Sequence, residues 1–481
     1  MSLLRYTGHP LVDVGVATIT AFSGVESPEN ISDEHLNEFV NFIRSIYMNR
    51  TMAWFLHNSV FPNIYFAQPA LLKDSKYDAV REEALKAYLN SYLPDAAIPG
   101  KEEASENEDR CIFSGDPAII RVARSVIPLT GSRDDINFVA EGSPKYPISG
   151  WCLLAMLAMP LGALRSGNRL WLVHTPQQEW LQYFAAANLQ RNRIAFHQQG
   201  LEELPRYSFP RTCLIEDMLE AQKELPRHVS LTSYLFLNNN KRSTIAIHYL
   251  ASSVISFVFE AKQRFGSVWD AIVTRAQEMP AQSKDEEGVF VYQKRNFFFE
   301  DLFDLPDRAF HFLRLYLLRQ PHPGKATGRQ RFDPRFNYSF IKERECIHWG
   351  LAELFLERIM NIDKERIASI KQLADRLADY IQRHDPRLFK RLFWARNDYT
   401  IRLELQKAAN AAQRYSDAPL VPYDEFIRVF FFDEGDAVRP DWYLARDLLM
   451  IRIIERLHQS GWIEQHPDIA EAEEPETESE A

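Results

Sequence analysis

One uninterrupted apolar run, residues 153–164, constrains the fold of this chain more than any other stretch. Its first part, residues 153–159, carries no polar side chain, so it must be covered on most sides. Pro160 and Gly162 lie near its end, where a helix would break. A second apolar segment, residues 170–173, is bounded by turn-forming residues and predicts a core strand. The sequence therefore predicts a buried helix followed by a buried strand, and the longer run is too short to cross a bilayer.

The chain has 481 residues, enough for two or three domains. We predict an α+β fold: a mixed body with a small sheet over residues 1–335, including a loop-rich module at 111–152, followed by a helical bundle at 336–465. Two apolar stretches, 231–237 and 243–250, predict a β-hairpin. Helices are also predicted at 251–263, 266–279 and 306–319. Helical spacing predicts bundle helices at 340–361, 363–383, 386–412, 423–431 and 441–460.

The charge of the chain is unevenly distributed. The net charge of −10 argues against a nucleic-acid partner. Much of the acid lies in two segments, however, which we predict to be an exposed loop at about 95–110 and a disordered tail at 466–481. Without them the body is close to neutral, and local basic patches become decisive.

The cellular compartment is suggested by two weak signals. The four cysteines are widely and irregularly spaced, which indicates no disulfide framework and a reducing environment. The first residues lack the apolar core of a signal peptide. We therefore expect a cytoplasmic protein without a membrane partner.

The predicted hairpin turn is the first candidate for contact with DNA. It consists of Asn238, Asn239, Asn240, Lys241 and Arg242. Asparagine amides can read a base edge, and lysine or arginine can contact phosphate or enter a base step. The alternative is that a triple asparagine is simply good turn chemistry, because asparagine tolerates left-handed backbone conformations.

Two further stretches combine cations with aromatic residues. In a loop-like segment that contains Phe332 and Phe336, the candidates are Lys325, Arg329, Arg331 and Arg335, preceded by Arg314 and Arg319. In a predicted helix that contains Phe389 and Phe393, the candidates are Arg387, Lys390 and Arg391. Cations beside aromatic rings suit backbone contact and stacking on single-stranded nucleic acid. A solvated basic loop or helix face explains each pattern equally well.

Catalytic motifs are absent from the sequence. It contains no glycine-rich phosphate loop, no His-Glu-x-x-His and no Gly-x-Ser-x-Gly. Cys346 and His348 are the nearest Cys/His pair, and two residues apart on a helix they would not share a face. We therefore predict a non-enzymatic protein with no cofactor and no metal ion.

Several short blocks follow one another through the first 260 residues. They are residues 6–15, Cys111-x-x-Ser114, 127–129, 137–138, Cys152, 157–164, 169–174 and 234–238. In this order they resemble the large subunit of a type I-B CRISPR surveillance complex (Cascade). The C-terminal half is similar to that family only in being helical.

The resemblance implies a non-catalytic subunit of an RNA-guided DNA-targeting complex. Such a subunit binds guide RNA and the backbone subunits, recognises the protospacer-adjacent motif (PAM) in double-stranded target DNA, and promotes unwinding. It then stabilises the R-loop and its displaced strand for a recruited helicase-nuclease, while guide–target pairing reads the sequence itself. The C-terminal helices resemble a Cascade small subunit. The sequence leaves open whether an internal start near residue 340 also yields these helices as a separate small subunit.

One departure from the family concerns its paired Cys-x-x-Cys knuckles, which resemble a four-thiolate zinc site. Here the pairs are Cys111-x-x-Ser114 and Ser149-x-x-Cys152, so two thiolates remain. A serine hydroxyl is a poor ligand for structural zinc, which prefers thiolate or imidazole. We therefore interpret residues 111–152 as a degenerate, zinc-knuckle-like module without metal.

Two alternatives remain open. In the first, the chain plays the same role in RNA-guided transposition, with transposon targeting proteins in place of the helicase-nuclease. In the second, it is an assembly scaffold with no DNA contact of its own. The overall acidity favours a scaffold, and the basic stretches oppose it.

Overall fold

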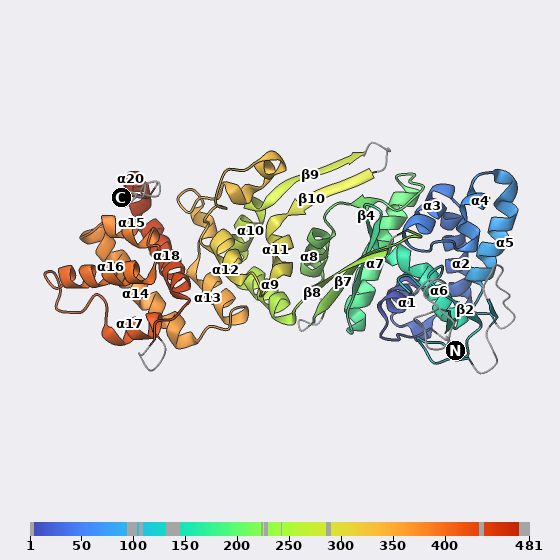
Figure 1. The fold of residues 1–481 in the computed structure, drawn as a ribbon, viewed down its shortest axis with the longest axis horizontal. Helices are drawn as coiled ribbons and strands as arrows, with labels where there is room; N and C mark the ends of the chain where they lie inside the picture. Colours follow the sequence, from blue (N-terminus) through green and yellow to red (C-terminus); the bar gives the residue numbers. More distant parts are fainter. Residues whose placement is uncertain are drawn as a thin grey trace. The chain divides into compact units, whose positions relative to one another are not determined.

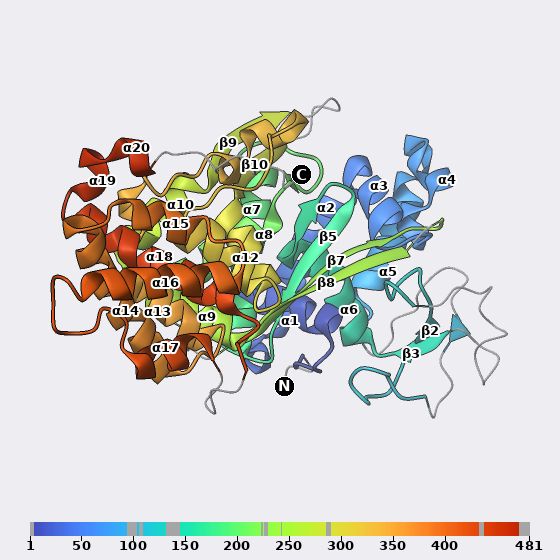
Figure 2. The same ribbon diagram turned by 60° about the vertical axis from the view of Figure 1, so that its left-hand side comes forward.

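The computed structural model describes residues 4–93, 103–104, 109–130, 145–222, 225, 229–241, 243–284, 290–431 and 437–470. They form two compact units, drawn in Figures 1 and 2. Unit 1 comprises Met1–Ser252 and Met279–Arg295, and unit 2 comprises Ser253–Glu278 and Asn296–Ala481. Helices and sheets are mixed, as the predicted α+β class requires. The predicted boundary between residues 335 and 336 falls inside unit 2.

Unit 1 is built around the apolar run. Its helices are α1 (Pro10–Ser23), α2 (Asp33–Tyr47), α3 (Arg50–Ser59), α4 (Pro69–Leu72), α5 (Asp78–Leu89), α6 (Gly150–Ala158), α7 (Gln178–His197) and α8 (Pro210–Ala221). The predicted buried helix is α6, all of whose residues are buried. It packs on α1 so closely that a Cβ atom built at Gly15 would lie 1.8 Å from the carbonyl oxygen of Ala155, so only glycine fits there.

Two sheets complete the described part of unit 1. The smaller has the order β1-β2-β3 and comprises β1 (Glu103–Ala104), β2 (Ile120–Val122) and β3 (Tyr146–Ile148). The larger has the order β8-β7-β5-β4-β6-β10-β9. It comprises β4 (Leu164–Ser166), β5 (Arg169–His174), β6 (Arg206–Tyr207), β7 (Leu231–Asn238), β8 (Ser243–Leu250), β9 (Gln277–Lys284) and β10 (Phe290–Asn296). The predicted core strand is β5, and the predicted hairpin is the antiparallel pair β7–β8.

Unit 2 is mainly helical. Its helices are α9 (Ser252–Arg264), α10 (Gly266–Arg275), α11 (Phe297–Asp301), α12 (Ala309–Phe312), α13 (Trp349–Arg358), α14 (Lys364–Arg383), α15 (Arg387–Phe393), α16 (Asp398–Ala412), α17 (Tyr423–Phe430), α18 (Trp442–Gln459), α19 (Trp462–Gln465) and α20 (Pro467–Ala470). The predictions for α14, α17 and α18 are confirmed to within a residue or two. Pro467–Ala470, in the tail that we predicted to be disordered, form the helix α20, which corrects that prediction for these residues. Residues 471–481 of the predicted tail and most of the predicted acidic loop lie outside the described residues.

Three helix predictions are corrected. The predicted helix 386–412 is divided, because Asn397 caps α16 by accepting a hydrogen bond from the Thr400 amide (2.7 Å). The predicted helix 340–361 begins only at Trp349. A helix we expected to run from 266 to 279 ends at Arg275, and the chain continues as β9, where Pro280 could not continue a helix.

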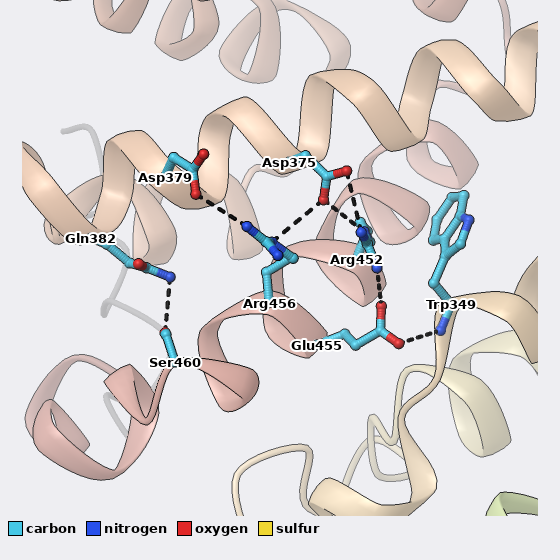
Figure 3. A network of polar contacts seen from close by, with 8 residues as sticks. All are labelled: Trp349, Asp375, Asp379, Gln382, Arg452, Glu455, Arg456 and Ser460. Atoms are coloured by element: carbon cyan, nitrogen blue, oxygen red, sulfur yellow. Dashed lines mark hydrogen bonds and ion pairs between the residues drawn. The ribbon is translucent and has the colours of Figure 1, made fainter.

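Polar contacts join three helices of unit 2, as Figure 3 shows. Arg452 on α18 donates to the carboxylates of Asp375 on α14 (2.7 Å) and of Glu455 (2.6 Å). Glu455 in turn accepts from the backbone amide of Trp349 at the start of α13 (3.0 Å). Arg456 lies 3.4 Å from Asp379, one turn further along α14. Ion pairs therefore link α18 to α14, and the hydrogen bond of Glu455 links α18 to the start of α13.

Candidate nucleic-acid interface

The turn between β7 and β8, residues 238–241, is fixed to the rest of unit 1; we call it the hairpin tip. The side-chain amide of Asn238 is fully buried and donates to the backbone carbonyls of Val60 (2.7 Å) and Arg124 (3.2 Å). Its oxygen accepts from Nε of Arg124 (3.0 Å) and from the Ser243 hydroxyl (3.2 Å). Figures 1 and 2 show the hairpin reaching toward the N-terminal helices.

Asn238 therefore supports the fold, and its assignment to DNA is corrected. Asn238 has no exposed amide with which to read a base, because burial and four hydrogen bonds occupy it. The Asn239 side chain accepts from the Lys241 amide within the turn (3.0 Å), and its carbonyl accepts from Arg124. This is the turn chemistry that the alternative interpretation of the sequence described.

Asn240 and Lys241 remain at the surface of the hairpin tip. The Asn240 amide forms a reciprocal pair with that of Asn63, with N···O distances of 2.7 and 3.2 Å. Lys241 is exposed, and no carboxylate among the described residues lies within ion-pair distance of it. Arg242 lies outside the described residues. The tip thus presents an amide pair and an ammonium group on a fixed base.

The arginines around the second predicted patch are mostly used in ion pairs. Arg314 lies 2.7 Å from Asp447, and the fully buried Arg319 lies 2.5 Å from Glu343. Arg335 contacts the carboxylates of Asp301 (2.6 Å) and Asp333 (2.7 Å). The assignment of Arg335 to DNA is therefore corrected, because its charge is neutralised inside unit 2.

Other side chains of this patch point to solvent. We call residues 320–336 the basic loop. Lys325 and Arg331 are exposed, and no described carboxylate lies within ion-pair distance of either. Phe332 is 70% exposed, whereas Phe336 packs against His322, with ring centroids 5.0 Å apart. The side chain of Arg329 is outside what the structure describes. The exposed chemistry of this loop is one aromatic ring preceded by two cations.

The third patch, on α15, is divided in the same way. Arg391 donates to Asp385 and to Glu404 on α16, both at 2.6 Å, so its charge is balanced within unit 2. Burial by itself would raise the pKa of Glu404, but hydrogen bonds from Lys407 and Arg391 outweigh it and lower that pKa. Arg387 is exposed and Lys390 partly exposed, and within the described part of the chain neither side chain meets a carboxylate. These two stay candidates.

The two cysteine–serine pairs, Cys111 with Ser114 and Ser149 with Cys152, lie together in unit 1. The hydroxyl oxygens of Ser114 and Ser149 are 3.4 Å apart, beside the buried thiols of Cys111 and Cys152. A hydrogen bond from the Cys152 thiol, then those from both serines, lower the pKa of Cys111, and the same thiol–thiol contact raises the pKa of Cys152. Two thiols and two hydroxyls do not make the donor set of a structural zinc site.

The residues that position the hairpin tip are the ones that sequence reasoning missed. Asn63 and Arg124 lie more than a hundred residues before the tip and contact it directly. Neither stands in a motif. Asn63 has a left-handed backbone (φ 67°), which asparagine tolerates, so its residue type favours a turn and does not point to a partner.

Comparison with known proteins identifies no relative. No protein-family model, curated protein or solved structure matches the chain. Across the described ranges, no group of three or more His, Cys, Asp or Glu side chains is arranged to hold a metal ion. None of the described helices is both long enough and apolar enough to cross a membrane.

Proposed function

We propose that this chain is the non-catalytic large subunit of an RNA-guided type I CRISPR complex, in which it recognises the PAM and helps to open the duplex. The single observation that carries the proposal is the hairpin tip. A turn fixed by the buried Asn238 holds Asn240 and Lys241 at the surface, where an amide and an ammonium could meet base edges and phosphate. Its partners would be guide RNA, backbone subunits, target duplex and displaced strand.

The meeting of the two knuckles supports the family resemblance. Cys111 and Ser114 are separated from Ser149 and Cys152 by a stretch of chain that includes residues outside the structural description, yet all four side chains lie together. A module descended from a four-thiolate zinc site would keep this arrangement. The cluster supports the resemblance and has no role of its own in DNA binding.

A scaffold without DNA contact is the second candidate, and one observation favours it. Arg314, Arg319, Arg335 and Arg391, which look basic in the sequence, are all in ion pairs. The basic surface is therefore smaller than the sequence suggests. A role in RNA-guided transposition would leave the DNA contacts unchanged and alter only the proteins recruited.

A mobility-shift experiment separates these candidates. Guide-loaded backbone complex is mixed with short duplexes of varied flanking sequence, with and without this chain, at two salt concentrations. The proposal expects that the chain adds flank-dependent affinity that falls with salt, because phosphate contacts release counterions. A chain that joins the complex and leaves duplex binding unchanged would be a scaffold.

Substitutions at the tip test the carrying observation. Lys241→Ala combined with Arg242→Ala should reduce the slope of log affinity against log salt by up to about 2, at about 0.9 for each phosphate that is no longer neutralised. Assembly of the complex should not change. Lys86→Ala is the matched control, because that exposed lysine is already paired with Glu82 (3.2 Å). Equal salt slopes for the double variant and the control would remove the hairpin assignment.

A further inference from the structure

Both ends of the basic loop of unit 2 are fixed by arginines that form ion pairs inside the unit. The buried Arg319, directly before the loop, is paired with Glu343. At its end Arg335 is bound to Asp301 and Asp333, and the carbonyl of Arg335 accepts from the amide of His322 (2.9 Å). This backbone contact closes the loop on itself. The middle of the basic loop is therefore supported by two fixed ends.

The tip of the loop is a short turn that ends in an exposed ring. Residues Gly328–Phe332 form a 3-10 turn, which Thr327 and Gln330 cap reciprocally. The amide of Asp333 then donates to the carbonyl of Gln330 (3.0 Å), which directs the chain back to the base. Phe332 stands at this point and is 70% exposed. The nearby Phe336 packs against His322 and is partly buried, so the loop shields one of its two phenylalanines and leaves the other in water.

Charge and ring chemistry together select the ligand. Arg331 precedes the ring directly and Lys325 lies on the same loop, both exposed and both without a carboxylate partner in the described residues. Cations that follow a phosphate backbone, with an aromatic ring on which a base can stack, are the combination that binds single strands. A duplex keeps its base faces stacked internally, so an exposed ring has more to gain from an unpaired base.

We propose that the basic loop binds single-stranded nucleic acid, with Phe332 stacked on one unpaired base and Lys325 and Arg331 on neighbouring phosphates. The inference rests on the proposed function in one respect, since duplex opening would supply the single strand. It adds a residue-level contact in unit 2 that is independent of the hairpin tip.

The test measures binding of the full chain to a single-stranded oligonucleotide that carries a fluorescent adenine analogue. Phe332→Ala should weaken binding by about 5-fold to 150-fold, the range expected for loss of one stacked base, and should abolish the stacking-dependent change in fluorescence. Phe332→Trp, which keeps an aromatic ring, should retain both the affinity and the fluorescence change. Tyr423→Ala is the matched control, because this tyrosine of the same unit is 75% exposed and should leave affinity unchanged.

The charged residues give a separate readout. Lys325→Gln with Arg331→Gln should lower the salt slope by about 1.4, at about 0.7 for each single-strand phosphate, whereas Phe332→Ala should leave that slope unchanged. The inference is overturned if the wild-type chain does not bind the oligonucleotide, or if Phe332→Ala binds it as tightly as wild type.

Failure of this inference and failure of the proposed function are distinguishable. Flank-dependent duplex binding together with an unaffected Phe332→Ala variant would overturn the stacking site alone. Single-strand binding that depends on Phe332, in a chain that adds nothing to duplex recognition in the guide-loaded complex, would support the stacking site and overturn the proposed function.

Discussion

The hairpin tip of unit 1 and the basic loop of unit 2 both present an exposed lysine, but different interactions fix the two turns to the protein. Neutral hydrogen bonds of the buried Asn238 fix the hairpin tip. Ion pairs of Arg319 and Arg335 fix the basic loop. In the first case the base is an amide among backbone carbonyls, and in the second it is a set of guanidinium–carboxylate contacts.

This difference shows how residues of one type divide between support and surface. In the hairpin, one asparagine is buried and another is exposed two residues later. In the second patch, Arg319 is buried whereas Arg331 is in water. A side chain that anchors a turn is engaged within the fold and is therefore not available to a ligand. Such residues do not belong to the candidate binding surface, whatever their residue type. The two anchors also differ in the penalty for breaking them, which the following predictions use.

The largest effect is expected at the ionic anchor. Arg319→Ala should lower the free energy of unfolding by about 3–5 kcal/mol, because it leaves the Glu343 carboxylate in the interior without its partner. Urea denaturation of the full chain measures this. Arg319→Met with Glu343→Leu should recover most of the loss, since no buried charge remains. A single variant as stable as wild type would show that the pair does not anchor the loop.

The neutral anchor should be weaker. Asn238→Ala should cost about 1–3 kcal/mol, because the carbonyls of Val60 and Arg124 lose their donor in a buried site. Duplex binding should fall as well, since the tip loses its fixed position. Asn240→Ala is the control and should change stability by no more than about 0.5 kcal/mol, because that amide is exposed. Equal losses for the two variants would contradict the division between base and surface.

A third ionic contact, between Glu404 on α16 and Arg391 on α15, should make stability depend on pH. Because contacts with Lys407 and Arg391 leave its pKa below the ordinary value of 4.5, its contribution is present above that value and is lost as pH falls through the lowered pKa. Glu404→Gln should therefore cost about 1.5–3 kcal/mol at pH 7, as expected for hydrogen bonds to a charged group. At pH values below the lowered pKa, wild type and variant should converge. Denaturation curves that stay equally far apart in acid would contradict this assignment.

The smallest effects are expected at the two exposed lysines. Lys241→Gln and Lys325→Gln should each change the free energy of unfolding by less than about 0.5 kcal/mol, because neither ammonium has a carboxylate partner in the described residues. Thermal melting of both variants beside wild type measures this. A loss of more than about 1 kcal/mol at either lysine would place that residue among the anchors and remove it from the candidate interface.

Local patterns in the sequence predicted much of the fold. The helix α6 and the strand β5 follow from runs of apolar residues, and the hairpin β7–β8 follows from two such runs around a turn. The helices α14 and α18 follow from apolar residues at helical spacing. The predicted end of α10 was wrong because the residues after Arg275 pair into a sheet as β9, which outweighs their local helical spacing. Strand partners such as β6 and β10 are distant in sequence, so periodicity does not reveal them.

The candidate interface was predictable only as a set of stretches. The amino-acid sequence by itself determined where cations, amides and aromatic rings are concentrated, because composition is local. The tertiary structure alone decided which of them face solvent. Arg314 forms an ion pair with Asp447, and Asn238 donates a hydrogen bond to Val60, each across more than a hundred residues of chain. Burial and pairing depend on such distant neighbours, and therefore the sequence could name Lys325 and Arg335 together while only the fold separated them.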